Sequence, residues 1–330
     1  MKAFARRLGV RVLSGLVMVF VVASLTFFLV HMIPGNPVLA RYETLIQEGY
    51  NPRAALALTE QMYGFIPHQP LWQQYLAYIG QLAHLNLGQS ILYSGVAVSH
   101  IIFAAMPWTL GMVSAGLILS FVFGLSAGVF AAIARNRWTG SATTMFSTLL
   151  HGIPPYMVAL VLAFVFTTLW PIFPFGAPYD AAIKPGLSGP FLGSLAYHAT
   201  LPGAAYVIAS YGGWALSTKA SVISVLGDDY ILAAELRGLR PITRMGYVAR
   251  NAILPLFTTL TLTIGFMFAG AVFIETIFDY PGLGYLIINS TGAHDYPLMD
   301  GTFLLITMAV IAANILADLL YTWIDPRIRA

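Results

Sequence analysis

Cysteine is absent from all 330 positions of the sequence. Its absence excludes disulfide bonds and metal sites built on thiolate ligands. The seven histidines lie far apart and show no ligand spacing, so a metal site built from them is not expected either. The sequence also lacks a nucleophile elbow and a glycine-rich, phosphate-cradling loop ahead of a lysine. It therefore predicts neither an enzyme nor a chain with its own nucleotide site.

Charged residues are the second scarcity. Asp, Glu, Lys and Arg make up 9% of the sequence, whereas a soluble domain carries about 25%. Hydrophobic residues reach 58% and the mean hydropathy is +0.78. These values predict an integral membrane protein. The net charge of +3 and the pI near 9.0 do not indicate nucleic acid as a partner, because the positions of the basic residues have a membrane explanation.

Six apolar runs follow one another along the chain, and a spanning helix needs roughly 20 apolar residues. The runs cover Val12 to Val30, residues 101 to 134, Ser141 to Trp170, Ala196 to Ser217, Ala252 to Ile274, and Gly301 to Trp323. The first is too long for the core of a signal peptide, so we expect it to stay in the mature protein. The sequence thus predicts one all-α polytopic membrane domain over residues 1–330, with six transmembrane helices.

The basic residues are distributed unevenly over the segments that connect these runs. Four precede the first run, two lie in the turn at 135–139, five in residues 218–251 and two in the C-terminal tail, which makes thirteen of the sixteen. The alternate segments hold only three. Lys and Arg concentrate on the cytoplasmic side of membrane proteins. Both termini and residues 218–251 are therefore predicted to be cytoplasmic, and residues 34–99 external.

The segment 34–99 is too polar to span a membrane and is predicted to form a small external insert of two or three helices. Apolar residues recur with helical spacing from Glu43 to Leu58 and from Leu71 to Leu85. Asn86 to Gly88 is predicted to form a turn. Aromatic residues such as Trp72 suit a membrane–water interface. The insert can be a packed cap or a lid that grips a substrate, and the sequence leaves both open.

Residues 218–251 form the polar segment around which the rest of the chain is organised. Asp228 and Asp229 suit the first turn of a short helix, where carboxylates favour the exposed N–H groups. Ala233 and Ala234 favour a helix and carry almost no side chain, so another surface can approach closely. We interpret the segment as a cytoplasmic loop that receives force from a partner protein. The alternative is an ordinary solvated loop.

The same segment contains clear helix boundaries. Gly227 interrupts the preceding helical pattern. Arg237 suits the last turn of the short helix, and Gly238 the position just past its end. Pro241 can open a second helix at its first position, and we expect that helix to run until Pro255.

Few groups within the apolar runs are suited to line a path for a solute, and ionisable residues in spans are the usual mark of such a path. The candidates for a path or gate are His151, Pro154, Pro155, Glu275 and Asn314. The double proline removes helix hydrogen bonds and can be either a flexing point or a static kink. The Pro/Gly turn after Glu275 can seat a re-entrant piece, contact an external partner, or simply end a helix.

Seven short motifs stand in a characteristic order and spacing. They are Met32-Ile-Pro-Gly-Asn-Pro37, Leu85-Asn-Leu-Gly-Gln-Ser90, Pro107-Trp-Thr-Leu110, Asp229 to Gly238 with Arg250 to Pro255, Glu275 to Gly284, Asp295-Tyr-Pro297 and Asp325-Pro-Arg-Ile-Arg329. Together they resemble permease subunits of ABC transporters of the dipeptide/oligopeptide type, over nearly the whole chain. The sequence departs from the family at Asn36 and Asn86, where aspartate is usual. It departs again at Glu235. The family's signature is Glu-Ala-Ala, with the glutamate first, whereas here Ala233 and Ala234 precede Glu235.

The resemblance implies a binding-protein-dependent importer in a prokaryotic plasma (inner) membrane. This chain would pair with a second homologous permease, two ATP-binding subunits and an extracellular or periplasmic solute-binding protein, surrounded by membrane lipid. It would bind no cofactor, because ATP and Mg²⁺ would lie on the partner subunits. The resemblance further implies that coupling to the ATPase depends on Asp229, Ala233, Ala234, Glu235, Arg237, Gly238, Leu239 and Arg240.

The resemblance also suggests a solute. A peptide-class solute is expected from the family, delivered by the binding protein and moved by alternating access. The same architecture in related permeases carries oligosaccharides or nickel chelates, and aromatic, nearly uncharged spans fit neutral sugars equally well. A secondary transporter or channel is the alternative of another class. It would need buried acids or a self-contained gate, which we do not find in the sequence.

Overall fold

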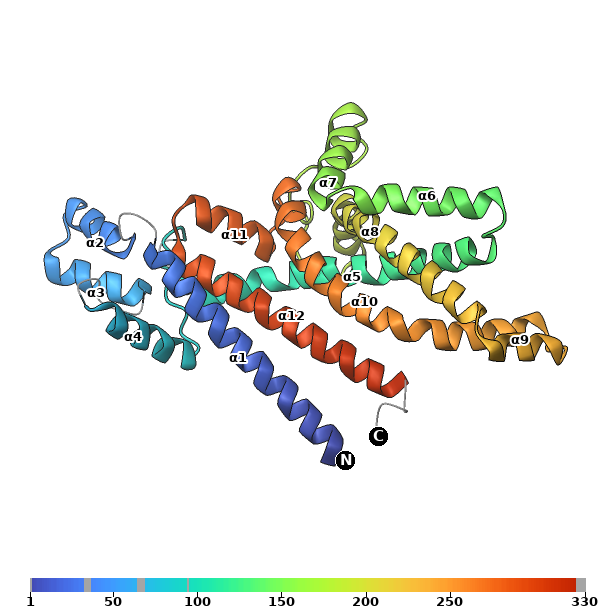
Figure 1. Cartoon of the computed structure of the whole chain (residues 1–330). Helices are drawn as coiled ribbons and strands as arrows, with labels where there is room; N and C mark the ends of the chain where they lie inside the picture. Colours follow the sequence, from blue (N-terminus) through green and yellow to red (C-terminus); the bar gives the residue numbers. More distant parts are fainter. Residues whose placement is uncertain (1, 33–36, 64–68, 94, 325–330) are drawn as a thin grey trace. The chain divides into compact units, whose positions relative to one another are not determined.

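The computed structural model describes residues 2–32, 37–63, 69–93 and 95–324. Within these ranges the chain forms helices and one isolated antiparallel bridge, between Gln89 and Ala97. The elements, including the π-helix η1, are α1 (Lys2–Met32), α2 (Pro37–Gln47), α3 (Pro52–Tyr63), α4 (Leu71–Ala83), α5 (Val98–Ile133), α6 (Trp138–Gly152), α7 (Pro155–Ala163), η1 (Phe164–Leu169), α8 (Gly189–Leu226), α9 (Asp229–Leu236), α10 (Pro241–Ile277), α11 (Leu283–Gly292) and α12 (Tyr296–Ile324) (Figure 1). The motif positions 33–36 and 325–330 lie outside the described residues.

The length and composition of the helices fit a membrane protein. Four segments are long and apolar enough to cross a bilayer: Gly9–Leu29, Val98–Ile133, Thr259–Ile277 and Tyr296–Ala317. Helices α6 and α7–η1 together would make a fifth, strongly bent one. Helix α8 contains the expected fourth run and is 38 residues long, yet it falls short of the same apolar criterion in the described chain. The all-α polytopic fold is confirmed, and the count of six spans stays a prediction.

The chain divides into two compact units. The first comprises Met1–Trp108 and Pro281–Ile311, and the second Thr109–Tyr280 and Ala312–Ala330. Helices α5 and α12 each contribute one part to either unit.

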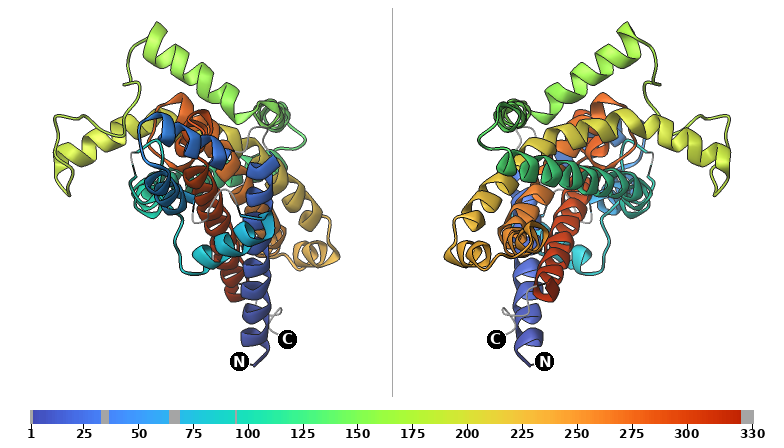
Figure 2. Two further views of the ribbon diagram at one scale, coloured as in Figure 1. Left: turned by 90° about the vertical axis from the view of Figure 1, so that its left-hand side faces the viewer. Right: turned by 90° about the vertical axis from the view of Figure 1, so that its right-hand side faces the viewer.

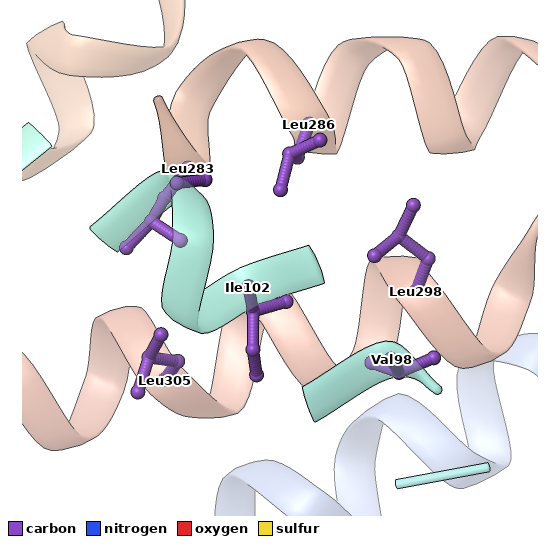
Figure 3. Close-up of a cluster of buried hydrophobic side chains, with 7 residues drawn as sticks. Val98, Ile102, Leu283, Leu286, Leu298 and Leu305 are labelled. Carbon is purple, nitrogen blue, oxygen red and sulfur yellow. The ribbon is translucent and has the colours of Figure 1, made fainter. Parts of the chain in front are cut away.

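The first unit has an aliphatic core at the start of α5 and α12. The buried side chains come from three helices: Val98, Ile102, Ala105, Leu283, Leu286, Leu298 and Leu305. Figure 3 shows the labelled members of α11 and α12 pointing toward Val98 and Ile102 of α5. Burying a leucine of this kind stabilises the fold by roughly 1.5–3 kcal/mol. This core fixes where α11 and the first turns of α12 lie beside α5.

The insert is helical, but one expected helix is wrong. The structure has no continuous helix from Glu43 to Leu58, because α2 ends at Gln47 and α3 begins at Pro52. Gly49 has φ of +96°, a left-handed conformation that glycine adopts without strain. The Asn51 side chain then accepts a hydrogen bond of 2.8 Å from the backbone N–H of Ala54, which caps α3. The helical spacing of apolar residues continues across this break, so the spacing alone could not predict it.

The second unit is held together by close helix contacts at glycines. A methyl group added at Gly124 of α5 would lie 2.3 Å from the Cβ of Trp214 on α8. One added at Gly128 would lie 2.5 Å from the carbonyl oxygen of Ala215. Small residues that let helix backbones approach in this way are typical of membrane helix packing. The glycines therefore fix α5 directly against α8.

Helices α6 and α7 meet at a bend of 95° (Figure 2). Helix α6 ends at Gly152, and α7 begins at Pro155, with Pro154 as its extended N-cap residue. Proline lacks the N–H that would continue the ladder of α6 and disfavours helical backbone in the residue before it. The double proline was predicted to interrupt this run. The structure shows that it separates two helices of very different direction.

Helix α10 corrects another boundary. It was expected to end at Pro255, but it runs without interruption from Pro241 to Ile277. Proline inside a helix costs one backbone hydrogen bond, which a packed or membrane-embedded helix tolerates. Helix α8 likewise continues to Leu226, past the expected end of its apolar run. The polar segment 218–251 is therefore mostly helical, and α9 with its flanking turns connects two long helices.

Candidate functional site

The candidate site is built on α9, the eight-residue helix Asp229–Leu236. Gly227 follows the last residue of α8, as predicted. Asp228 was expected in the first turn of the short helix, but it is the extended N-cap residue of α9. The carbonyl oxygen of Asp228 accepts a 3.0 Å hydrogen bond from the N–H of Ile231. Asp229 lies in the first turn, where its carboxylate favours the positive end of the helix dipole.

The C-terminal end of α9 is a Schellman motif. Gly238 has φ of +71°, and its N–H donates to the carbonyl of Glu235 at 2.9 Å. The N–H of Leu239 donates to the carbonyl of Ala234 at 3.1 Å. This pair of bonds, with glycine in the left-handed position, closes a helix and reverses the chain. The predicted helix end at Gly238 and helix start at Pro241 are confirmed.

One side of α9 is packed against its own chain. Its anchor is Ile231, which is 5% exposed and lies in a buried cluster with Ala132, Val222, Val225, Val248 and Ala252. The Ser221 hydroxyl donates a 2.6 Å hydrogen bond to the carbonyl of Ala252. This bond ties the end of α8 to the start of α10. Both neighbours of α9 are thus fixed to each other, and the cluster also includes Ala132 of α5.

The other side of α9 is exposed and largely apolar. We call it the α9 surface, and its exposed apolar side chains are Tyr230, Leu232, Ala233, Leu236, Leu239 and Ile242. Leu236 is 80% exposed and Ile242 is 78% exposed. A methyl group added at Gly238 meets nothing within 4 Å. The surface is thus open to a partner, and exposed apolar patches of this kind mark contact sites.

Charged residues surround the α9 surface. Asp229, Arg237 and Arg240 are all exposed, as the prediction of contacts to a partner requires. Glu235 instead binds Arg244 of α10 within the chain, with Oε1 and the guanidinium nitrogen 2.8 Å apart. Since Glu235 is 61% exposed at its side chain, this ion pair contributes at most about 1 kcal/mol to stability.

The structure separates the two alanines. Ala233 is exposed, whereas Ala234 is 5% exposed and turned into the chain. The close approach expected at Ala234 is therefore made by the protein's own helices. The sequence analysis also missed Leu232, Leu236 and Ile242. Their residue types could have indicated this surface, because large aliphatic residues in a short, otherwise polar segment do not form the regular apolar face of an amphipathic helix.

The candidates for a path or gate lie on several helices of the second unit. His151 lies in the last turn of α6. Gly212 of α8 packs closely against it, since a methyl group added at Gly212 would lie 2.7 Å from the His151 backbone nitrogen. Pro155 opens α7 after Pro154, and its ring lies against Gly270 of α10, 3.6 Å from a methyl group placed there. These contacts anchor the bend from both sides, which favours a static kink over a flexing point.

Glu275 and Asn314 are both inward-facing. Glu275 is 1% exposed, on the last turns of α10. Burial, and next the Glu275 carboxylate, raise the pKa of Tyr280 to about 12. The Oδ1 atom of Asn314, in α12, is buried without a hydrogen-bond partner among the described residues. A pocket in the second unit is lined by apolar residues of α5 and α10, such as Phe121 and Phe257, and has a volume near 340 Å³.

Two of the sequence motifs meet in the first unit. Asp295, fully buried ahead of α12, accepts hydrogen bonds at Oδ2 from the Ser90 hydroxyl (2.5 Å) and from the N–H groups of Ile91 and Leu92 (both 2.9 Å). Its Oδ1 accepts from the N–H of Leu298 at 3.2 Å. These bonds join the last part of the insert to the first turn of α12.

The chain is similar in sequence to known membrane transport proteins. Residues 124–330 match the sequence model of the family described as "Binding-protein-dependent transport system inner membrane component". The chain is 33% identical over 346 residues to the di/tripeptide transport system permease protein DppB of Pseudomonas aeruginosa, covering 98% of each chain. It is 31% identical over 330 residues to the dipeptide transport system permease protein DppB of Escherichia coli, covering 93% of this chain and 94% of the relative.

A third relative has a different named solute. The glutathione transport system permease protein GsiC of Escherichia coli is 30% identical over 321 residues, with 97% of both chains covered. Among solved structures, an amino acid ABC transporter with histidines aligns with a TM-score of 0.46 and 13% identity, over 69% of this chain and 94% of that chain. On the family match and the full-length relatives, this chain belongs to the inner membrane components of binding-protein-dependent transport systems, the permease subunits of ABC importers.

Proposed function

We propose that the α9 surface is where an ATP-hydrolysing subunit docks on this permease, and that docking transmits the work of ATP hydrolysis to the membrane helices. The observation that carries the proposal is the exposed apolar surface formed by Leu232 and Leu236 of α9 with Ile242 at the start of α10, while the other side of α9 is packed against the chain. Burial in a partner's groove would remove these side chains from water, at roughly 25 cal/mol per Å² of apolar area.

The frame around α9 suits the transmission of force. Helix α8, of 38 residues, ends just before α9, and helix α10, of 37 residues, begins just after it. The Schellman motif at Gly238 and the bond between Ser221 and Ala252 fix both connections. A displacement of α9 therefore tilts α8 and α10 rather than being absorbed by a flexible loop. Such a tilt can switch a central path between outward and inward access.

The proposal assigns sides of the membrane and partners. Residues 218–251 and both termini would be cytoplasmic, and the insert 34–99 external, as the distribution of basic residues predicts. The coupling contacts would come from Asp229, Ala233, Arg237, Gly238, Leu239 and Arg240. The buried Ala234 and the exposed Glu235, through its ion pair with Arg244, would support the helix. Two ATP-binding subunits carrying ATP and Mg²⁺, a second homologous permease and an external solute-binding protein would complete the importer.

The solute that we propose is of the peptide class. It is supported by relatives named for transport of dipeptides, di- and tripeptides, and glutathione, which is itself a peptide. Oligosaccharides and nickel chelates stay as alternatives within the same architecture. Transport measured with the cognate binding protein would decide between them, because accumulation of a labelled dipeptide but not of a trisaccharide is the expected result.

The coupling proposal is tested in proteoliposomes that hold the assembled importer. Leu236→Asp places a charge at the centre of the proposed contact and should lower ATP-driven uptake at least about tenfold, the effect of losing 1.4 kcal/mol of docking energy. Leu187→Asp is the matched control, because Leu187 is 97% exposed on the segment between η1 and α8. Equal uptake by the two variants would contradict the assigned surface.

A further inference from the structure

Helix α4 differs from the other helices of the insert in the side chains that it exposes. Its sequence, LWQQYLAYIGQLA, contains no charged residue. Leu71, Trp72 and Leu76 are 46%, 62% and 60% exposed. Helix α3 instead exposes Arg53 and Glu60. An uncharged helix that turns tryptophan and leucine outward is unsuited to water and needs an apolar neighbour.

The second face of α4 is attached to α1. The hydroxyl groups of Tyr75 and Ser24 lie 2.7 Å apart in a hydrogen bond. The ring of Tyr75 stacks on Phe28, with centroids 5.4 Å apart, and lies edge-on to Phe27 at the same separation. Tyr78 packs on Phe27 at 5.3 Å. Three aromatic contacts and a hydrogen bond thus set the position of α4 along α1 (Figures 1 and 2).

This attachment fixes the depth of α4 in the bilayer. Residues 24–28 of α1 are the last turns of the apolar segment Gly9–Leu29, which is long enough to span a membrane. Helix α4 is therefore held beside the end of a membrane span rather than above it. At this depth the surroundings change from hydrocarbon to lipid head groups, where Trp and Tyr side chains are preferred.

The exposed face of α4 resembles the exposed face of the apolar segment of α1 to which it is attached. On α1, Leu25 is 56% exposed and Leu29 is 60% exposed, values close to that of Leu76. Helices that lie in the interface carry leucine and aromatic residues on one side and polar groups on the other. Gln73 and Gln81 provide partly exposed polar groups of α4. Gln74 is buried, and its amide donates a 2.7 Å hydrogen bond to the carbonyl of Gln69.

We propose that α4 is an interfacial helix that rests in the lipid leaflet at the C-terminal end of α1, with Leu71, Trp72 and Leu76 in contact with phospholipid. The helix holds the insert at a constant height above the membrane. Arg53 and Glu60 of α3 remain in water, where a soluble partner can reach the insert. This inference does not depend on the coupling role of α9, because it concerns another unit of the chain.

The absence of cysteine makes the test direct, since a single introduced cysteine carries the only thiol of this chain. A nitroxide spin label is attached at Leu76→Cys in the assembled importer, reconstituted in phosphatidylcholine–phosphatidylglycerol nanodiscs with cysteine-free partner subunits. Its accessibility to molecular oxygen, which concentrates in lipid, is compared with that to a water-soluble nickel chelate. Leu16→Cys is the lipid control, because Leu16 is 62% exposed within the span of α1. Glu60→Cys on α3 is the water control.

The expected result is an oxygen-to-nickel accessibility ratio at Leu76→Cys several-fold above that at Glu60→Cys and close to that at Leu16→Cys. A ratio equal to that of Glu60→Cys would overturn the proposal, because the face would then be in water. Low accessibility to both reagents would also overturn it, because a protein would then cover the face. If Leu76→Cys fails to assemble, Trp72→Cys gives the same measurement one turn earlier on the same face.

Discussion

Replacing Asp295 by alanine should release the segment of residues 88–98 from the start of α12. In the native chain one carboxylate accepts four hydrogen bonds, from Ser90, Ile91, Leu92 and Leu298. Alanine has no acceptor, so all four donors lose their partner at once. The segment is the C-terminal part of the insert, and its attachment holds that part of the insert at the start of α12.

The size of the effect follows from which donors water can reach. Ile91 and Leu92 are partly or fully open to solvent, so water can replace the carboxylate there. Ser90 and Leu298 are fully buried, and a buried donor without a partner costs about 1–3 kcal/mol. The Leu298 bond also caps α12, a contribution of about 0.5–2 kcal/mol. Counting the Ser90 donor once and the Leu298 bond once, as the cap, these losses amount to about 1.5–5 kcal/mol, or roughly 10- to 5000-fold in a local opening equilibrium.

Hydrogen exchange of the purified importer measures that equilibrium. Peptides that cover residues 88–98 should exchange faster in Asp295→Ala by a factor within this range, while peptides that cover α9 should exchange as in the native protein. Ser90→Ala removes one donor and leaves the other three bonds, so it should have a smaller effect. Unchanged exchange of residues 88–98 in Asp295→Ala would refute the idea that this carboxylate holds the segment.

Three further predictions concern the second unit. Gly124→Ala should destabilise the protein by about 1–3 kcal/mol through overpacking against α8. A methyl group at Gly111 on the same helix meets nothing within 4 Å, so Gly111→Ala should be neutral or stabilising. Equal melting temperatures of the two variants would contradict this. Gly238→Ala should destabilise the end of α9 by about 1–2 kcal/mol because of its positive φ, and Gly238→Asn by less, as thermal unfolding would show. Because the pKa of Tyr280 is raised from 10.0 to about 12, the unfolded chain loses this proton first, and the stability of the folded protein should fall as the pH rises from about 10 to 12. Tyr280→Phe should remove that part of the decline. An identical decline in both proteins would contradict the assignment.

The ends of α9 could be predicted because they depend on local chemistry. A glycine past the last turn and a proline at the first position of the next helix determine the backbone wherever the segment lies. Gly238 and Pro241 accordingly occupy the expected places. The distinction between Ala233 and Ala234 depends on which side of α9 meets α8 and α10, and neighbouring residues in the sequence do not encode that side.

The two wrong helix boundaries have opposite causes. At Pro255 the local rule predicts an end, but packing along α10 compensates for the one lost hydrogen bond and the helix continues. At Gly49 the apolar periodicity predicts continuity, but the left-handed glycine and the Asn51 cap end one helix and begin another. A single residue with a strong preference decides the structure only where the surroundings do not oppose it.

The contact between Ser90 and Asp295 could not have been predicted from spacing, because the residues are 205 positions apart. Both belong to motifs that resemble the permease family, but the resemblance gave their order and not their pairing. The bond follows from the packing of α5, α11 and α12 (Figure 3), which brings the residues ahead of α5 and α12 to one place. Long-range contacts of this kind are where the structure adds most to the sequence.

The most direct test of the account is a site-specific cross-link from a single cysteine at Leu236→Cys on the α9 surface. In the native membrane, a thiol-reactive photo-cross-linker at this position should join the permease to an ATP-binding subunit, and the same linker at Leu187→Cys should not. An impermeant maleimide should reach Leu236→Cys in inside-out vesicles from which the ATP-binding subunits have been stripped, but not in intact cells. Labelling of Leu236→Cys from outside the cell, or cross-links that never include an ATP-binding subunit, would contradict the coupling role of α9.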